Sequence, residues 1–110
     1  MDDEQFEEHV RAALDSLPDD IAKGLENVAV VVEDESPDDP WILGTFFGYP
    51  HGERTPSGAL PAKVVIYRRP LMEGFPEPAE LERQIRITVL HELAHYFGID
   101  EDRIAELGYR

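Results

Sequence analysis

The first part of the chain alternates apolar and charged residues at the period of an α-helix. Asp2 or Asp3 can cap the start of this helix, and Pro18 follows its end. We therefore predict an amphipathic helix over residues 4–17 and a short helical turn over residues 19–25. The apolar stripe that should face the core consists of Phe6, Val10, Ala13, Leu14 and Leu17.

Three later stretches are dense in β-branched, aromatic and other apolar residues, which is typical of strands. The predicted strands are residues 28–33 (VAVVVE), 41–49 (WILGTFFGY) and 63–69 (KVVIYRR). Gly44 and Gly48 mark a bulge or turn in the second strand, and Pro70 closes the third. From its place in the chain order, we expect the strand at 63–69 to form an edge of the sheet.

The longest helical pattern runs from Pro78 to Phe97. Proline suits the first helical position, where its missing N–H costs nothing, and Gly98 suits the position just past the end. A last short helix is predicted at about residues 101–107. The succession of a helix, strands and two further helices predicts an α+β fold.

Length and composition narrow the class of protein. With 110 residues, the chain is expected to form one domain, residues 1–110. It has no cysteine, so a bound metal would need nitrogen and oxygen ligands. The N-terminus lacks a basic stretch followed by an apolar run, and no apolar stretch approaches the ~20 residues of a membrane span. We therefore expect a cytoplasmic protein with no membrane partner.

Charge is distributed unevenly along the chain. The formal net charge is −14, and residues 1–40 hold 14 of the 24 acidic residues but only two of the ten basic ones. Such a balance opposes binding to phosphates, so no nucleic-acid partner is expected. We interpret the acidic part as a solubilising surface, with a docking face for a basic partner or a field that favours cationic substrates as the alternative.

The chemistry is concentrated in the second half of the long helix. Past Arg86, apolar residues cover most of its circumference, which predicts burial on most sides. The remaining sector holds Thr88, His91, Glu92 and His95. A buried polar group without a partner costs about 1–3 kcal/mol, so the two histidines and the glutamate need a shared partner. A metal ion can be that partner.

His91, Glu92 and His95 form the H-E-x-x-H pattern of zinc metallopeptidases. Residues four apart on a helix have Cβ atoms about 5–6 Å apart, so both imidazoles can bind one Zn²⁺. Glu92 is turned roughly 100° from His91 and can act as the catalytic base without being a ligand. Its carboxylate would take a proton from the water that zinc makes acidic. We predict one zinc per chain.

A catalytic zinc takes three protein ligands and keeps one position open. The pattern continues as H-E-x-x-H-x-x-G-x-x-E, in which Gly98 allows the chain to turn back toward the metal. Glu101 falls at the third-ligand position, and the neighbouring Asp102 is the alternative. Asp100 is the less favoured third candidate.

The segment TVLHELAHYFGIDEDRIAELGY, residues 88–109, resembles the small bacterial zincin-like metallopeptidases, or mini-zincins, described by HExxHxxGxxD. The upstream order of helix, strands and loop, with VAVVVED, resembles the family over most of the chain. The resemblance implies a single zincin-like domain with a short mixed β-sheet of about three strands above the active-site helix. It also implies a zinc peptidase activity.

The sequence departs from the family pattern at Glu101, where the family has aspartate. Glutamate is one methylene longer and still binds zinc. The methionine turn that lies beneath the metal in metzincins has no counterpart downstream of the helix. By resemblance, Tyr109 fills this supporting role, and a tail residue packed on the helix is the alternative reading.

The sequence therefore predicts a zinc-dependent metallopeptidase that hydrolyses a peptide or protein substrate, with Glu92 as the catalytic residue. The alternative is a non-catalytic metal-binding or regulatory module on the same fold. A metal-dependent RNA endonuclease would carry histidine in place of Glu101, and the acidity opposes RNA binding. A homodimer through an exposed apolar patch is compatible with the sequence.

Overall fold

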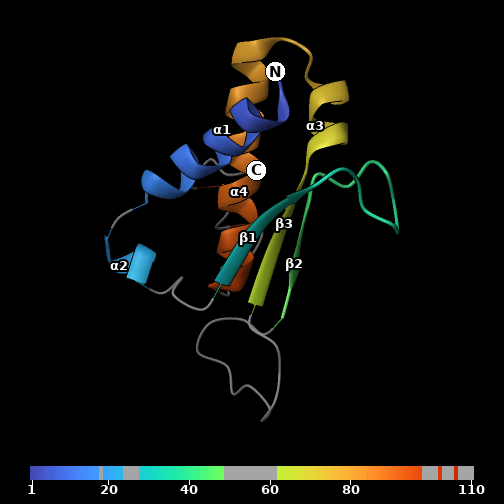
Figure 1. The fold of residues 1–110 in the computed structure, drawn as a ribbon. Coiled ribbons are helices and arrows are strands. Elements are labelled where there is room, and N and C mark those ends of the chain that lie inside the picture. The colour runs from blue at the N-terminus through green and yellow to red at the C-terminus, as the bar shows by residue number, and fades with distance from the viewer. Residues whose placement is uncertain (18, 24–27, 49–61, 98–101, 103–105, 107–110) are drawn as a thin grey trace.

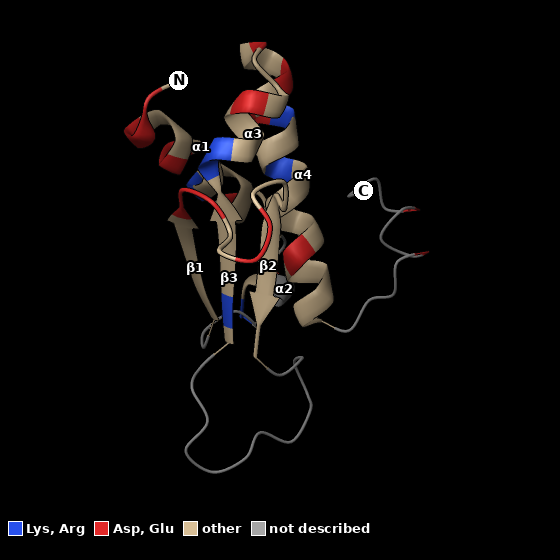
Figure 2. Ribbon diagram, turned by 90° about the vertical axis from the view of Figure 1, so that its right-hand side faces the viewer, with Lys and Arg blue, Asp and Glu red and all other residues tan. Residues whose placement is uncertain are grey.

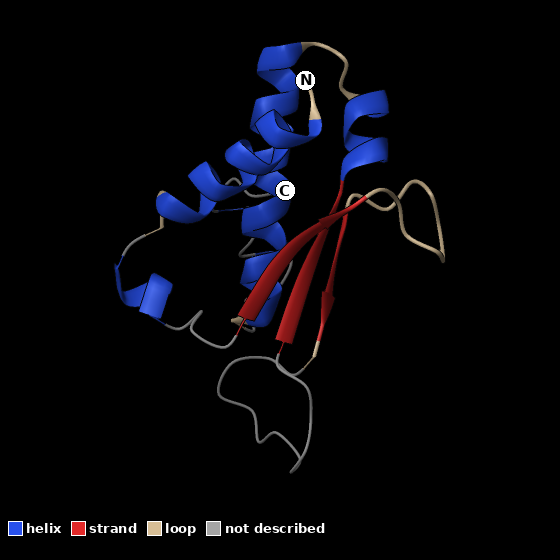
Figure 3. Ribbon diagram, in the orientation of Figure 1, coloured by secondary structure: helices blue, strands red, loops and turns tan. Residues whose placement is uncertain are grey.

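Residues 1–17, 19–23, 28–48, 62–97, 102 and 106 are described by the computed structural model (Figure 1). They form a mixed three-stranded sheet with helices packed on one of its faces (Figure 3). The predicted α+β class and the mixed sheet of about three strands are confirmed. The residues predicted to form the site, His91, Glu92 and His95, lie on a helix of the covering layer.

Helix α1, Asp3–Asp15, begins with a capping box. The Asp2 carboxylate accepts a hydrogen bond from the Gln5 N–H at 2.8 Å, and the Asp2 N–H donates to Gln5 Oε1 at 3.0 Å. The predicted stripe faces inward, with Phe6, Val10 and Ala13 buried. The short helix α2, Asp19–Lys23, follows where a helical turn was expected.

The sheet has the strand order β1-β3-β2. β1 (Val28–Glu33) runs parallel to β3 (Ala62–Tyr67), and β2 (Gly44–Phe47) runs antiparallel to β3. β3 is thus the central strand, and the expectation that residues 63–69 form an edge is wrong. Chain order misled this prediction because the parallel pairing of β1 with β3 leaves β2 at the edge, where it contacts helix α4.

The bounds of the second and third strands differ from the prediction. The second strand begins at Gly44, because the preceding residues form a turn in which Ile42 N donates to Asp39 O at 3.3 Å. The third strand ends at Tyr67, and helix α3, Arg68–Gly74, follows directly. Pro70 lies in the first turn of α3, where a missing N–H is tolerated. Pro70 is therefore compatible with a helix that begins at Arg68, although the sequence pattern had assigned residues 68 and 69 to a strand.

Arg68, at the start of α3, connects three segments of the chain. Its guanidinium donates to the carboxylates of Asp3 and Asp34, and Arg69 pairs with Glu35. The hydrogen bond from Arg68 holds the pKa of the Asp34 carboxyl below its ordinary value. The stability from this exposed pair is present above the unfolded pKa of Asp34 and is lost as the pH falls through the lowered folded pKa. Part of the acidic charge is thus paired within the fold (Figure 2).

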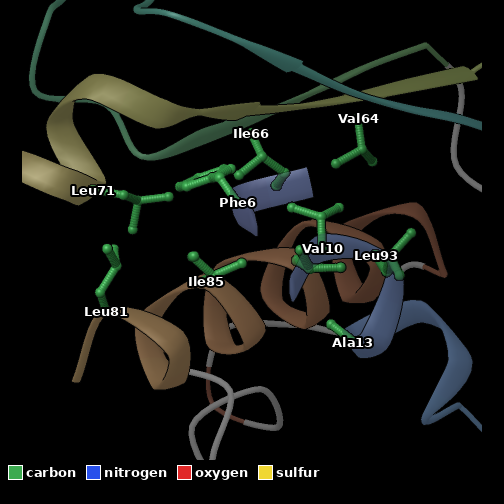
Figure 4. Packing of buried hydrophobic residues seen from close by; sticks show 10 residues of the cluster. Phe6, Val10, Ala13, Val64, Ile66, Leu71, Leu81, Ile85 and Leu93 are labelled. Atoms are coloured by element: carbon green, nitrogen blue, oxygen red, sulfur yellow. The ribbon is translucent and has the colours of Figure 1, made fainter. Parts of the chain in front are cut away.

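Helix α4, Pro78–Tyr96, confirms the predicted long helix. Its cap is Glu77, whose carboxylate accepts from the Glu80 N–H at 2.8 Å. α4 and α1 pack beneath the sheet, and their apolar faces meet it in one core (Figure 4). The buried core residues are Phe6, Val10, Ala13, Val64, Ile66, Leu71, Leu81, Ile85, Val89 and Leu93.

The predicted C-terminal helix at residues 101–107 is described at only two positions. Asp102 and Glu106 are both helical and exposed. Gly98 and residues 49–61 lie outside the described residues. Within the described part of the chain, no helix is both long and apolar enough to cross a membrane.

Candidate metal centre

The last two turns of α4 bring His91, Glu92 and His95 together. The Nε2 atoms of His91 and His95 are 3.0 Å apart, and the centroids of their rings are 4.7 Å apart. One potential ligand atom of each of the three residues lies within 4.8 Å of the others. Helix periodicity explains this meeting, because residues i and i+4 share one face.

The Nε2 atoms of the two imidazoles are separated by nearly the distance that a tetrahedral metal requires. A Zn²⁺ ion with bonds of about 2.0–2.1 Å holds two ligand nitrogens about 3.4 Å apart. The Nε2 atoms of His91 and His95 are already near that separation. Imidazole nitrogen and carboxylate oxygen are both common zinc ligands. In ligand type and in nitrogen separation, the residues present therefore fit a zinc ion.

Burial distinguishes Glu92 from the two histidines. Glu92 is only 8% exposed, whereas His91 and His95 are partly exposed. A charged carboxylate at such a place is costly unless cations or hydrogen bonds compensate it. A cation held by the two imidazoles would lie within reach of the Glu92 carboxylate. A metal ion bound by this cluster would be the shared partner that the sequence pattern predicts.

The edge strand β2 passes directly over Glu92. A Cβ atom added to Gly44 would lie 3.0 Å from Glu92 Cγ, 3.0 Å from Thr88 Cγ2 and 3.2 Å from Val65 O. Gly44 is therefore not a bulge but a point of close approach between strand and helix. Its missing side chain leaves the space in which the Glu92 side chain lies.

Gly44→Ala is expected to destabilise the protein by about 1–3 kcal/mol, because the new methyl group must displace Glu92, Thr88 or the backbone of β3. The matched control is Gly74→Ala, where an added Cβ would meet nothing within 4 Å. That change should be neutral or stabilise by about 0.4–1 kcal/mol. Urea unfolding of both variants measures the difference, and equal stabilities would show that β2 does not press on the helix.

Three other polar residues near these elements have structural partners. The Thr88 hydroxyl donates to the Gln84 carbonyl oxygen at 2.7 Å, so the helix itself satisfies it. Tyr96 is buried, with its ring centroid 5.8 Å from that of Phe46. His9 Nδ1 lies 3.9 Å from Glu82 Oε1, between α1 and α4. None of these three belongs to the His91-Glu92-His95 cluster.

The third ligand predicted from the sequence stays a prediction. Glu101 and Tyr109 lie outside the described residues. Asp102 is among the described residues, is exposed, and does not belong to the cluster of His91, Glu92 and His95. The structure thus brings together the three residues of the H-E-x-x-H pattern, and Glu101 remains the first candidate to complete the ligand set.

A cavity of about 260 Å³ opens beside the centre, between β2 and α4. Sequence reasoning did not identify most of its walls. On α4, helix periodicity could have found them, because Gln84, Ile87 and Thr88 precede His91 by seven, four and three residues. On β2, the glycine within a strand was the available signal. The lining residues are Leu43, Gly44, Gln84, Ile87, Thr88, His91 and Glu92.

Comparison with known families agrees with this geometry. A family profile described as zincin-like metallopeptidase matches residues 25–109, which include the whole sheet and α4. The chain belongs to the zincin-like metallopeptidase family. The family resemblance predicted from the sequence is thereby confirmed. Zincin-like proteins typically hold zinc, and the His91-Glu92-His95 cluster of this zincin-like chain is able to bind a metal ion.

A solved structure shares the zincin-like fold seen here. It is a conserved hypothetical protein (TTHA0227) from Thermo thermophilus, with a TM-score of 0.62 and 25% sequence identity. The alignment covers 94% of this chain and 97% of that chain. No curated protein matches the chain. The structural similarity therefore extends over the domain as a whole.

Proposed function

We propose that this zincin-like protein is a zinc-dependent peptidase. The observation that carries the proposal is the convergence of His91, Glu92 and His95 within 4.8 Å beside an open cavity. Membership of the zincin-like metallopeptidase family supports it. In this proposal, His91 and His95 hold one zinc ion per chain. Glu101 is the third ligand, with Asp102 as the alternative.

Each step of the proposed reaction has a group to perform it. Bound zinc supplies Lewis acidity, which polarises the peptide carbonyl and makes water acidic enough to react near neutral pH. The Glu92 carboxylate takes a proton from the attacking water while the water oxygen bonds to the carbonyl carbon. Glu92 then gives this proton to the amide nitrogen as the C–N bond breaks. The products are a carboxylic acid and an amine, and at neutral pH the proton of the acid passes to the amine to leave a carboxylate and an ammonium group.

The edge strand gives an extended substrate a place to bind. β2 is the edge strand beside α4, and Gly44 lies directly over Glu92. An extended peptide can add to the edge of a sheet through main-chain hydrogen bonds. β2 therefore replaces the strand at residues 63–69 as the candidate for peptide binding. A peptide on β2 would bring its carbonyl groups close to the metal centre.

Metal content and hydrolysis together test the proposal. Protein purified without chelator should contain about one zinc per chain by elemental analysis. It should cleave members of a peptide library, with new termini identified by mass spectrometry. Chelation should stop cleavage, and added zinc should restore it, because the Lewis acid is required.

Two results would count against this function in different ways. If the protein stayed free of zinc after zinc was added, the proposal of a zinc enzyme would be excluded. One zinc per chain without cleavage of any peptide would favour the alternative, a non-catalytic metal-binding module on the same fold. RNA cleavage without peptide cleavage would point to an endonuclease instead.

A further inference from the structure

Resting on the proposed function, we propose that the cavity between β2 and α4 is a substrate side-chain pocket selective for uncharged, apolar residues. We further infer that Gln84 determines this selectivity. The cavity has a volume of about 260 Å³. An engineered apolar cavity of roughly 150 Å³ already holds benzene, so a phenyl ring or a branched alkyl chain fits here.

The position of the cavity makes it part of the site. His91 and Glu92 line one end of it, and Gly44 lies on its strand side. A substrate side chain can enter the cavity only if the substrate backbone lies beside β2 and the metal centre. A peptide residue next to the cleaved bond meets this condition.

The walls of the cavity favour apolar groups. Leu43 and Ile87 line it with alkyl side chains. Thr88 directs its hydroxyl to the Gln84 carbonyl oxygen, and its methyl group lies beneath Gly44. Burying a phenyl or leucyl side chain favours binding roughly 10- to 100-fold over leaving it exposed. The cavity should therefore select such a side chain from a peptide.

The charges on the walls disfavour ionised groups. Among the seven lining residues, all of which the structure describes, Glu92 is the only carboxylate, and none is lysine or arginine. An acidic side chain would be repelled by the Glu92 carboxylate, and the cation nearest to it would be the zinc that His91 and His95 are proposed to hold, where it would compete with the attacking water. A basic side chain would pair with Glu92 and withdraw this carboxylate from the attacking water. Either charge thus lowers the rate of hydrolysis.

Gln84 marks the end of the cavity farthest from the metal centre. It precedes His91 by seven residues, which corresponds to about 10 Å along a helix. Its Nε2 donates to Glu80 Oε1 at 2.8 Å. A neutral amide at this end offers no countercharge to a long ionised side chain. Changing its charge should therefore change which side chains are accepted.

The test compares peptides that differ only at a residue flanking the cleaved bond. Native protein should hydrolyse the peptide with phenylalanine or leucine roughly 10- to 100-fold faster, in kcat/KM, than the one with aspartate. In Gln84→Glu, Glu80 repels the new carboxylate toward the cavity. This variant should shift the ratio of kcat/KM for lysine and phenylalanine peptides about 10-fold toward lysine. Ala79→Glu adds the same charge at an exposed position of α4 outside the cavity and should leave the ratio unchanged.

A binding measurement separates this inference from the peptidase proposal. N-acetylphenylalaninamide should shift the NMR signals of the Gly44 and Thr88 amides, whereas N-acetylaspartamide should not. Selective binding without hydrolysis of any peptide would support the proposed side-chain pocket and contradict the proposed peptidase activity. Hydrolysis with equal kcat/KM for phenylalanine and aspartate peptides would contradict the selectivity of the pocket and still support the peptidase activity. Unchanged ratios in Gln84→Glu would overturn the role of Gln84.

Discussion

Glu92→Gln is expected to lower kcat by roughly 10²- to 10⁴-fold while the protein keeps its zinc. Glutamine has nearly the same shape as glutamate, so it can occupy the space beneath Gly44 without a new contact. It cannot accept a proton from water at neutral pH, so the step that Glu92 performs is lost. The measurement is kcat on a peptide that native protein cleaves, together with zinc content by elemental analysis.

Glu82→Gln is the matched control for this change. Glu82 is an exposed carboxylate on the same helix, outside the cavity and the His91-Glu92-His95 cluster. Its replacement removes the same charge and should leave kcat and zinc content unchanged. If Glu92→Gln lost the zinc, Glu92 would be a ligand and not the base. If kcat were unaffected, another group would have to take the proton.

The helices were the most predictable part of the fold because their signals are local. The capping residues Asp2 and Glu77 lie within one turn of the helices that they begin. Helix α3 had no such signal. Its start is supported by Arg68, whose partners Asp3 and Asp34 are 65 and 34 residues away in the chain. A tertiary contact of this kind favours the helix at Arg68 and Arg69, which the sequence pattern had assigned to the third strand.

In the candidate site, too, the local features were predictable from the sequence and the features that depend on tertiary packing were not. His91, Glu92 and His95 share one helix, so their spacing in the sequence fixes their geometry. The cavity joins α4 to Leu43 and Gly44, and its shape depends on how β2 lies against the helix. Sequence order suggested the wrong edge strand because pairing in a mixed sheet is a property of the whole fold. The metal-binding residues could therefore be predicted from the sequence, whereas the shape of the cavity beside them could not.

His95→Ala is expected to weaken zinc binding by more than about 100-fold. Even a residue that only supports a metal ligand contributes about 10- to 100-fold to affinity, and His95 is a predicted ligand. Alanine is a good helix former, so α4 should persist. Zinc at 100 times its Kd stabilises a native protein by about 2.7 kcal/mol. The variant should lose this zinc-dependent gain in denaturant unfolding, and competition with a chromophoric chelator measures the affinity directly.

His9→Ala provides a control with the same residue type. His9 lies between α1 and α4, with its Nδ1 atom 3.9 Å from Glu82 Oε1, and it is not in the metal cluster. Its removal should leave zinc affinity and zinc-dependent stabilisation unchanged. Equal zinc affinity in His95→Ala and native protein would exclude the centre on α4. A loss in both variants would instead mean that zinc binds through surface histidines. A loss in His95→Ala alone, with the same loss in His91→Ala, would assign the metal to the pair of Nε2 atoms that now lie 3.0 Å apart.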